Sequence, residues 1–163
     1  MRARNSDANE KERALAFAER MGLLCETQGL PRMSGRVIGW LLICDPPHQS
    51  LVELGDVLHA SKASISTSTR SLEQLKIIER VTFPGDRRDY VRVIPGAWQK
   101  LMARFEEESR IMRSIAEEGL AILDGTPPAR RERLEEMRDI YGFLLEMAPL
   151  LDAEWRKRQA KKK

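Results

Sequence analysis

The chain has 163 residues, of which 42% are hydrophobic and 33% are charged, and its formal net charge is +3 at pH 7. This length is typical of one domain, or of one small domain with a dimerisation arm. The N-terminus is polar, and the longest apolar run, Val37 to Cys44, is far shorter than the about 20 residues of a membrane span. We therefore expect a cytoplasmic protein with no membrane partner.

Residues 8–28 are expected to form an amphipathic helix that stops near Gly29. Its apolar side carries Leu15, Ala18, Met21, Gly22 and Cys25.

A second helix is predicted to begin at Pro31 and to end before Pro46. Its buried stripe should contain Met33, Val37, Trp40, Leu41 and Cys44. Gly35 and Gly39 lie four residues apart, and each glycine costs about 1 kcal/mol relative to alanine inside a helix. Two such residues on one side indicate that another helix passes close by.

Arg32 and Arg36 share another face of this helix. Two interpretations stay open: the pair binds phosphate or fixes the position of the helix that Ser61 caps further along the chain, or it forms salt bridges with nearby acids.

Two short helices joined by a tight turn are predicted next. Ser50 and Glu53 form a capping-box pattern, so a helix should start at about Leu51. Ser61 can cap a second helix that buries Ile65, Leu72 and Leu75. Because so few residues separate the two helices, they must cross at a steep angle.

The outer face of this second helix is polar and mostly uncharged, although serine and threonine are poor helix formers. Short donors and acceptors of this kind can reach base edges in a major groove. The alternative is an ordinary polar helix face in contact with water. The face comprises Ala63, Ser66, Thr67, Arg70 and Gln74, with Ser64 on its flank.

A β-hairpin should follow, with strands at residues 78–83 and 89–94. Arg87 and Arg88 lie at its tip, and residues 61–92 contain seven cationic and four acidic side chains. Arginines beside a groove-reading helix can neutralise phosphates or enter the minor groove. The alternative is a solvated tip, or ion pairs of these arginines with Asp86 and Asp89.

At this point the sequence resembles the MarR superfamily of winged helix-turn-helix regulators, and more closely its GbsR-like branch. The resemblance covers roughly residues 20–95. It rests on P-G-D-R-R-x-Y in the hairpin and on the upstream pattern P-R-x-x-G-R-x-x-G-x-L-L, found as Pro31, Arg32, Gly35, Arg36, Gly39, Leu41 and Leu42.

The resemblance implies a mainly α fold with a small β-hairpin wing, flanked by long N- and C-terminal dimerisation helices. It implies a sequence-specific dimeric repressor, associated with the nucleoid, that binds a pseudo-palindromic operator in double-stranded DNA and responds to a small-molecule effector such as a quaternary amine. Four aromatic side chains could contact such a ligand, namely Trp40, Trp98, Tyr141 and Trp155. Their helical spacing favours core packing instead, so no ligand residue is assigned.

The candidate DNA-binding residues lie on the second helix and on the hairpin. Lys62 is predicted to contact a phosphate, and Arg87 and Arg88 the backbone or the minor groove. Base edges or adjacent phosphates are assigned to Ser64, Ser66, Thr67 and Arg70. The alternative function is a winged-helix module that binds protein without sequence-specific DNA binding.

Two long helices are predicted after the hairpin, separated by a break at residues 124–128. Apolar residues recur at spacings of three and four along both, and one winged domain cannot cover both seams. A symmetric homodimer would cover them. The seams are Trp98, Leu101, Phe105, Met112, Ile115 and Ile122, and then Leu134, Met137, Tyr141, Leu144, Ala148, Leu151 and Trp155.

The predicted division is an N-terminal dimerisation helix at 1–30, a winged helix-turn-helix domain at 31–95 and a C-terminal helical dimerisation region at 96–163. The basic end of the chain, from Arg156 to Lys163, adds at most nonspecific attraction to phosphates.

An enzyme is not expected. His48 and His59 have no Asp, Cys or Ser at a spacing that suggests a nucleophile or a metal set. The sequence therefore predicts no catalytic residue, metal or cofactor. Cys25 and Cys44 lie in apolar helical stripes, where a thiol behaves as a small hydrophobe; redox sensing is the open alternative.

Overall fold

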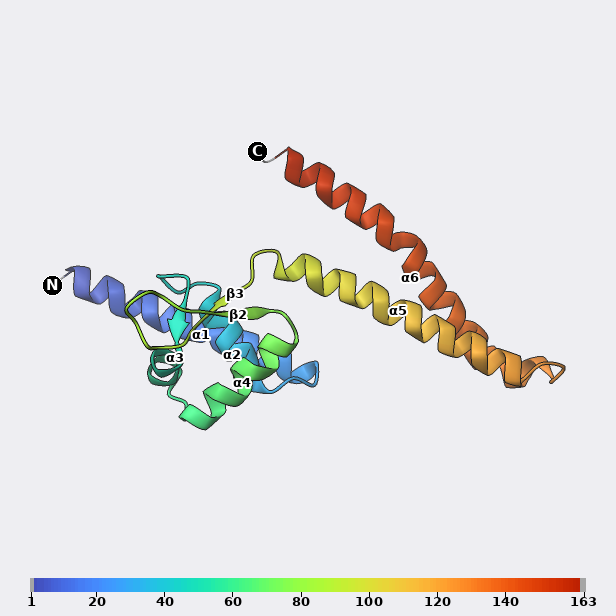
Figure 1. Cartoon of the computed structure of the whole chain (residues 1–163), viewed down its shortest axis with the longest axis horizontal. Coiled ribbons are helices and arrows are strands. Elements are labelled where there is room, and N and C mark those ends of the chain that lie inside the picture. Colours follow the sequence, from blue (N-terminus) through green and yellow to red (C-terminus); the bar gives the residue numbers. More distant parts are fainter. Residues whose placement is uncertain (1, 162–163) are drawn as a thin grey trace. The chain divides into compact units, whose positions relative to one another are not determined.

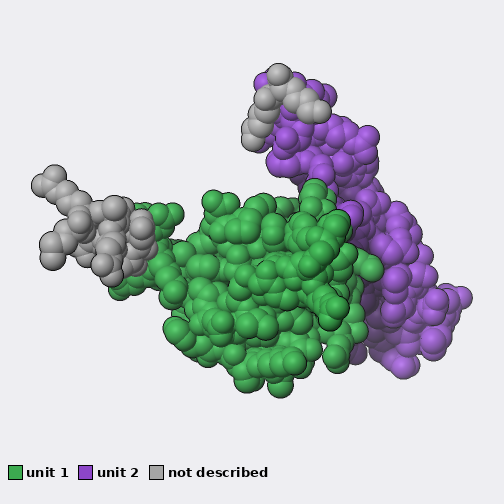
Figure 2. Space-filling view, turned by 60° about the vertical axis from the view of Figure 1, so that its left-hand side comes forward, with its two compact units in different colours: residues 1–98 green, residues 99–163 purple. Residues whose placement is uncertain are grey.

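The computed structural model describes residues 2–161, with side chains from residue 9 onward (Figure 1). It has two compact units, Met1–Trp98 and Gln99–Lys163 (Figure 2). Within the described residues the elements are α1 (Arg2–Thr27), α2 (Arg32–Leu41), β1 (Gln49–Ser50), α3 (Leu51–Leu58), α4 (Lys62–Gln74), β2 (Ile78–Val81), β3 (Tyr90–Val93), α5 (Ala97–Ile122) and α6 (Pro128–Ala160). The predicted mainly helical fold with a β-hairpin wing is confirmed. Lys162 and Lys163 of the basic tail lie outside the described residues.

The wing, residues 78–93, contains β2 and β3 paired in antiparallel register, with Ile78 opposite Val93. Both strands are shorter than predicted. A two-residue strand, β1, completes a sheet of order β1-β3-β2 through Gln49 opposite Val91 and Ser50 opposite Tyr90. The sequence did not predict β1, which fastens the start of α3 to the wing.

The core of the first unit lies where α2, α3, α4 and the sheet meet. Its buried side chains come from each of these elements, and several have no exposed surface at all. The cluster contains Ala18, Val37, Ile38, Leu41, Leu54, Leu58, Ile65, Leu72, Ile77, Ile78 and Val91. The predicted inward positions Ile65 and Leu72 are confirmed, while Leu75 is only partly buried.

Helices α1 and α2 approach so closely that glycine is required between them. A Cβ added to Gly35 would lie 2.7 Å from the Cα of Gly22 and 2.8 Å from the Cβ of Cys25. A Cβ on Gly39 would lie 2.7 Å from the Cα of Ala18. The predicted close passage of another helix is therefore confirmed, and that helix is α1.

α1 ends at Thr27, one residue before the predicted end, and the predicted stop residue Gly29 lies in the turn that follows. This glycine has a φ of 78°, and the next amide, of Leu30, donates to the carbonyl of Cys25 at 3.0 Å. A left-handed residue with this longer hydrogen bond is a common helix stop. α2 ends earlier than predicted, at Leu41, so Cys44 lies in the following turn rather than in the helical stripe.

In the second unit α5 and α6 pack against each other across the predicted break. Gly119 of α5 lies against Leu134 of α6, where a Cβ would be 2.8 Å from the leucine Cδ1. Gly125 has a φ of 71° in the connecting loop, and the Thr126 hydroxyl donates to the carbonyl of Leu123 at 2.7 Å. None of the helices in the described residues is long and apolar enough to cross a membrane.

Replacing Gly35 with alanine should destabilise the protein, because the new methyl group would meet backbone atoms of α1. We expect Gly35→Ala to lower the free energy of unfolding by about 1–3 kcal/mol. Urea denaturation at a fixed protein concentration would measure the change.

Gly142→Ala is the matched control. This glycine also lies inside a helix, but an added Cβ would meet only the Arg113 guanidinium at 3.9 Å. Its stability should stay the same or rise by up to about 1 kcal/mol. Equal effects of the two substitutions would contradict the proposed crossing.

Candidate nucleic-acid interface

α3 begins with the predicted capping box. The Ser50 hydroxyl accepts a hydrogen bond from the Glu53 amide at 3.2 Å, and the Glu53 carboxylate accepts one from the Ser50 amide at 2.7 Å. The helix ends at Leu58. The next residue, His59, has φ 50° and ψ 50°, and the Ala60 amide donates to the carbonyl of Gly55 at 2.9 Å. His59 is therefore a helix cap.

α4 begins at the next turn, where the Ser61 hydroxyl accepts from the Ser64 amide at 3.2 Å, as predicted. Two further polar residues of this helix, Ser68 and Thr69, are buried. The Thr69 hydroxyl donates to the carbonyl of Ile65 at 2.9 Å, which satisfies it within the helix. Small side chains on both faces allow α4 to pack closely on one side and to present short groups on the other.

The outer face of α4 is available to a ligand. Lys62, Thr67 and Arg70 are exposed, and Ser64 and Ser66 are half-buried. Within the described residues, none of these five side chains has a recorded hydrogen bond or ion pair with another protein group. The fold thus gathers the five α4 candidates on one helix with their polar groups uncommitted.

The wing loop is held by an electrostatic cluster around Arg88. Its guanidinium forms an ion pair with Asp86 at 2.7 Å and lies 3.5 Å from the Glu53 carboxylate. It also sits 5.1 Å from the ring centre of Tyr90, whose hydroxyl donates to Asp86 at 2.8 Å. Hydrogen bonds from Arg88, and then from Tyr90, hold the pKa of the Asp86 carboxyl well below its usual range.

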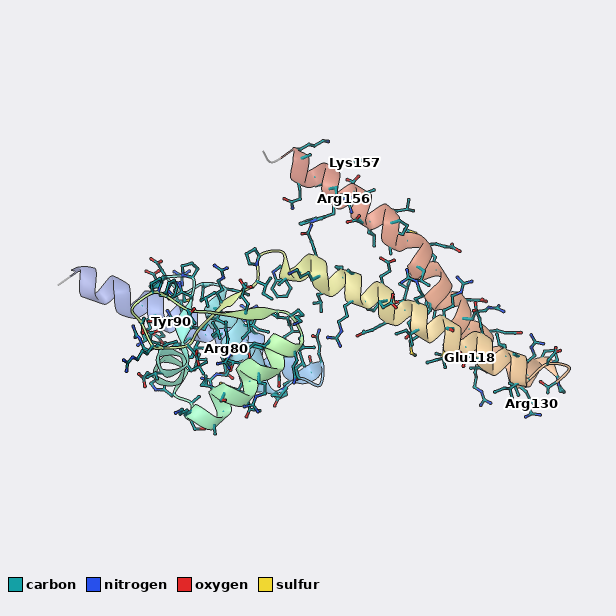
Figure 3. All side chains as sticks on the ribbon, viewed as in Figure 1. Arg80, Tyr90, Glu118, Arg130, Arg156 and Lys157 are labelled. Carbon is teal, nitrogen blue, oxygen red and sulfur yellow. The ribbon has the colours of Figure 1, made fainter. Side chains whose placement is uncertain are left out.

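Of the two tip arginines, Arg88 forms the ion pair with Asp86 that the alternative predicted, whereas within the described residues Arg87 pairs with neither aspartate. Arg80 pairs with Glu73 and Asp89, and Arg92 pairs with Glu79 (Figure 3 labels Arg80 and Tyr90). Arg87 is exposed, and the described residues include no ion pair for it. The tip therefore presents one uncommitted guanidinium beside one that is held in place.

An aromatic cluster that sequence reasoning missed supports the loop end of the wing. The His48 and Phe83 rings lie 4.6 Å apart, and Phe83 and Tyr90 lie 5.1 Å apart. His48 immediately precedes β1, which is why its contact with the wing depends on a strand that the sequence did not predict. The cluster gives His48 a packing role.

Two family models match the chain. Residues 28–89 match the model described as MarR family, and residues 96–158 match the MmpR5-like MarR family transcriptional regulator. The HTH-type transcriptional regulator MmpR5 of Mycobacterium tuberculosis is 43% identical over 133 residues, which are 80% of this chain and 79% of that protein. The chain belongs to the MarR family of transcriptional regulators.

A solved structure supports the same MarR-family fold. A crystal structure described as that of a transcriptional regulator is 41% identical, with a TM-score of 0.69, and the match covers 90% of this chain and 98% of the other. Transcriptional regulation by a DNA-binding winged helix, predicted from α4 and the wing, is therefore confirmed at the level of the MarR family.

Both cysteines of this MarR-family protein are poorly suited to thiolate chemistry. Cys25 is buried and Cys44 is half-buried, and burial raises the pKa of each thiol. Because the thiolate is the reactive form, a raised pKa disfavours oxidation at neutral pH. Both cysteines fit the predicted role of small hydrophobes.

The capping box should make stability depend on pH. The hydrogen bond from the Ser50 amide, more than the nearby Arg88 charge, lowers the pKa of Glu53 from its ordinary value of 4.5. A lowered pKa stabilises the folded state above pH 4.5, and this contribution is lost as the pH falls through the folded-state pKa.

Glu53→Gln tests this dependence, because glutamine can still accept the amide hydrogen bond but does not titrate. We expect the wild-type protein to be more stable than the variant at neutral pH and the difference to vanish in acid. Urea denaturation between about pH 7 and about pH 3 would measure it. A difference that does not change with pH would contradict the assigned role.

Proposed function

We propose that this chain is a homodimeric repressor that binds a pseudo-palindromic operator in the cytoplasm, associated with the nucleoid. One observation carries the proposal: the outer face of α4 presents short polar side chains without protein partners between two exposed cations, Lys62 and Arg70. Serine and threonine are poor helix formers, so an ordinary solvated helix gains nothing from them on its outer face. Base edges in a major groove are read by short polar groups of this kind.

Each contact residue has a distinct role in this proposal. Ser64, Ser66 and Thr67 read base edges, and Arg70 reads a base or an adjacent phosphate. Lys62 binds a phosphate. On the wing, Arg87 and Arg88 contact the backbone or the minor groove. Arg87 is exposed, while Arg88 is held in place by Asp86.

The homodimer is supported by apolar side chains that the second unit leaves exposed. On α5, Phe105 and Ile115 are 49% and 50% exposed; on α6, Leu151 and Trp155 are 66% and 44% exposed. These residues belong to the two predicted seams. Exposed apolar side chains that recur along a helix are typical of a protein interface, and a second copy supplies a symmetric cover.

We infer the division into residues 1–30, 31–95 and 96–163 as functional regions. Residues 1–30 also pack on α2 within the first unit, so the N-terminal helix would serve both the winged domain and the dimer.

The GbsR-like branch and its quaternary-amine effector stay predictions. The upstream motif supports the branch, whereas residues 96–158 match the MmpR5-like model. Trp40, Trp98, Tyr141 and Trp155 are the aromatic residues to test for ligand contact.

Selection of bound duplexes from a random pool tests the proposed function. The dimer should enrich one pseudo-palindrome whose half-sites are centred about 10–10.5 bp apart, which is one turn of duplex. Recovery of no common sequence would instead favour a winged-helix module that docks on protein.

The wing contact is tested by Arg87→Ala on the selected duplex. Loss of one phosphate contact in each subunit of the dimer should weaken binding at least about tenfold and reduce the slope of log affinity against log salt by about two. Arg92→Ala is the matched control, because Glu79 already neutralises its charge. The proposed Arg87 contact is wrong if Arg87→Ala leaves the affinity and the salt slope unchanged.

Thr67→Ala should instead change the duplex sequence that the protein selects.

The dimer is tested by placing a charge in the α6 seam. Leu151→Glu should shift the protein from dimer to monomer in light scattering, because a buried unpaired carboxylate opposes association. Val52→Glu is the control, since Val52 is 64% exposed on α3, outside either seam. A dimer that survives Leu151→Glu at micromolar concentration would exclude this part of the interface.

A further inference from the structure

Arg36 of α2 joins two helices that are distant in the sequence. Its Nε lies 3.0 Å from the Glu19 carboxylate of α1, and its Nη2 donates to the carbonyl of Leu58 at 2.8 Å. The side chain is 22% exposed, so both contacts are partly shielded from water. The salt-bridge interpretation of this arginine is therefore confirmed, and the side chain also contacts the end of α3.

A glycine on α1 makes room for this arrangement. A Cβ added to Gly22 would lie 2.8 Å from the Cγ of Arg36 and 3.0 Å from the carbonyl oxygen of Arg32. The arginine stem therefore lies directly on the backbone of α1. Its guanidinium is held between Glu19 and Leu58 by packing as well as by charge.

The Leu58 carbonyl is an informative partner because of its position. Leu58 is the last residue of α3, and the final carbonyls of a helix have no amide partner within it. A cation at this end also interacts favourably with the helix dipole. Arg36 thus caps α3 from outside, directly before the turn that leads to Ser61 and α4.

We propose that Arg36 is a positioning residue for DNA reading. It makes no contact with DNA itself. It fixes the end of α3 against α1, and because only three residues, His59 to Ser61, separate α3 from α4, it thereby fixes the direction in which the outer face of α4 points. The proposal rests on the proposed function, since it assigns a role within operator binding.

Arg32 provides the matched control within the same helix. It also pairs with Glu19, but its side chain is 49% exposed and, among the described residues, it has no recorded contact with α3. Arg32→Gln removes an equal charge from the same face of α2 and leaves the cap on Leu58 intact.

The experiment compares Arg36→Gln, Arg36→Lys and Arg32→Gln in two assays. The first measures affinity for the selected duplex and for a random-sequence duplex as a function of salt, well below the melting temperature of each variant. Arg36→Gln should weaken binding to the selected duplex about tenfold, with the random duplex and the salt slope unchanged. Arg36→Lys has a single side-chain nitrogen and cannot reach both partners as Nε and Nη2 do, so its affinity should lie between those of Arg36→Gln and the wild type. The affinity of Arg32→Gln should match that of the wild type.

The second assay is amide hydrogen exchange of the protein without DNA. In Arg36→Gln the amides of His59 and Ala60 should exchange faster, because the turn has lost its anchor, while in Arg32→Gln they should keep their protection. A wild-type protein that selects no duplex would refute the proposed function, but this assay would still report on the anchor.

Three results would overturn the proposal. The first is unchanged selective affinity in Arg36→Gln. The second is a parallel loss on both duplexes with a salt slope lower by about two, which would make Arg36 a direct phosphate contact in each subunit. The third is unchanged protection of the turn, which would show that Arg36 does not hold it.

Discussion

The contact between α1 and α2 decides where the other parts of the winged domain lie. Three glycines, Gly22, Gly35 and Gly39, let the two backbones come within the distance that one methyl group would fill. At that separation Glu19 reaches Arg36, and Arg36 reaches the end of α3. In this proposal the direction of α4 depends on the three glycines at the crossing as much as on the ion pair between Glu19 and Arg36.

Some cationic side chains of α4 and the wing pair with acids of the protein, and others are left to contact a ligand. Of the cationic side chains between residues 61 and 92, three arginines are neutralised by acids close by, so the local excess seen in the sequence overstates what a phosphate would meet. In the proposed DNA contact, Lys62, Arg70 and Arg87 supply charge that is not paired with an acid among the described residues, whereas Arg88 approaches the duplex already paired with Asp86. The salt dependence of binding should therefore come mainly from the three uncommitted cations.

Local signals in the sequence were sufficient for the caps and the periodic faces. The caps formed by Ser50, Glu53 and Ser61 involve residues three positions apart, so the local sequence predicts them. The two glycines of α2 likewise predicted that another helix packs close to it. The sequence could not decide between the alternative contacts of Arg88 and Arg36. Each contact depends on which carboxylate or carbonyl group the tertiary fold brings close to the arginine. The strand β1 was missed because two residues have no periodicity of their own, and its existence depends on pairing with β3.

The central claim is that α4 and the wing of each subunit read adjacent grooves of one half-site. Chemical footprinting of the selected duplex tests it most directly. We expect two protected major-groove patches about one helical turn apart, each flanked by minor-groove protection that disappears in the double variant Arg87→Ala/Arg88→Ala. A single protected patch, or flanking protection that persists in the double variant, would contradict this arrangement.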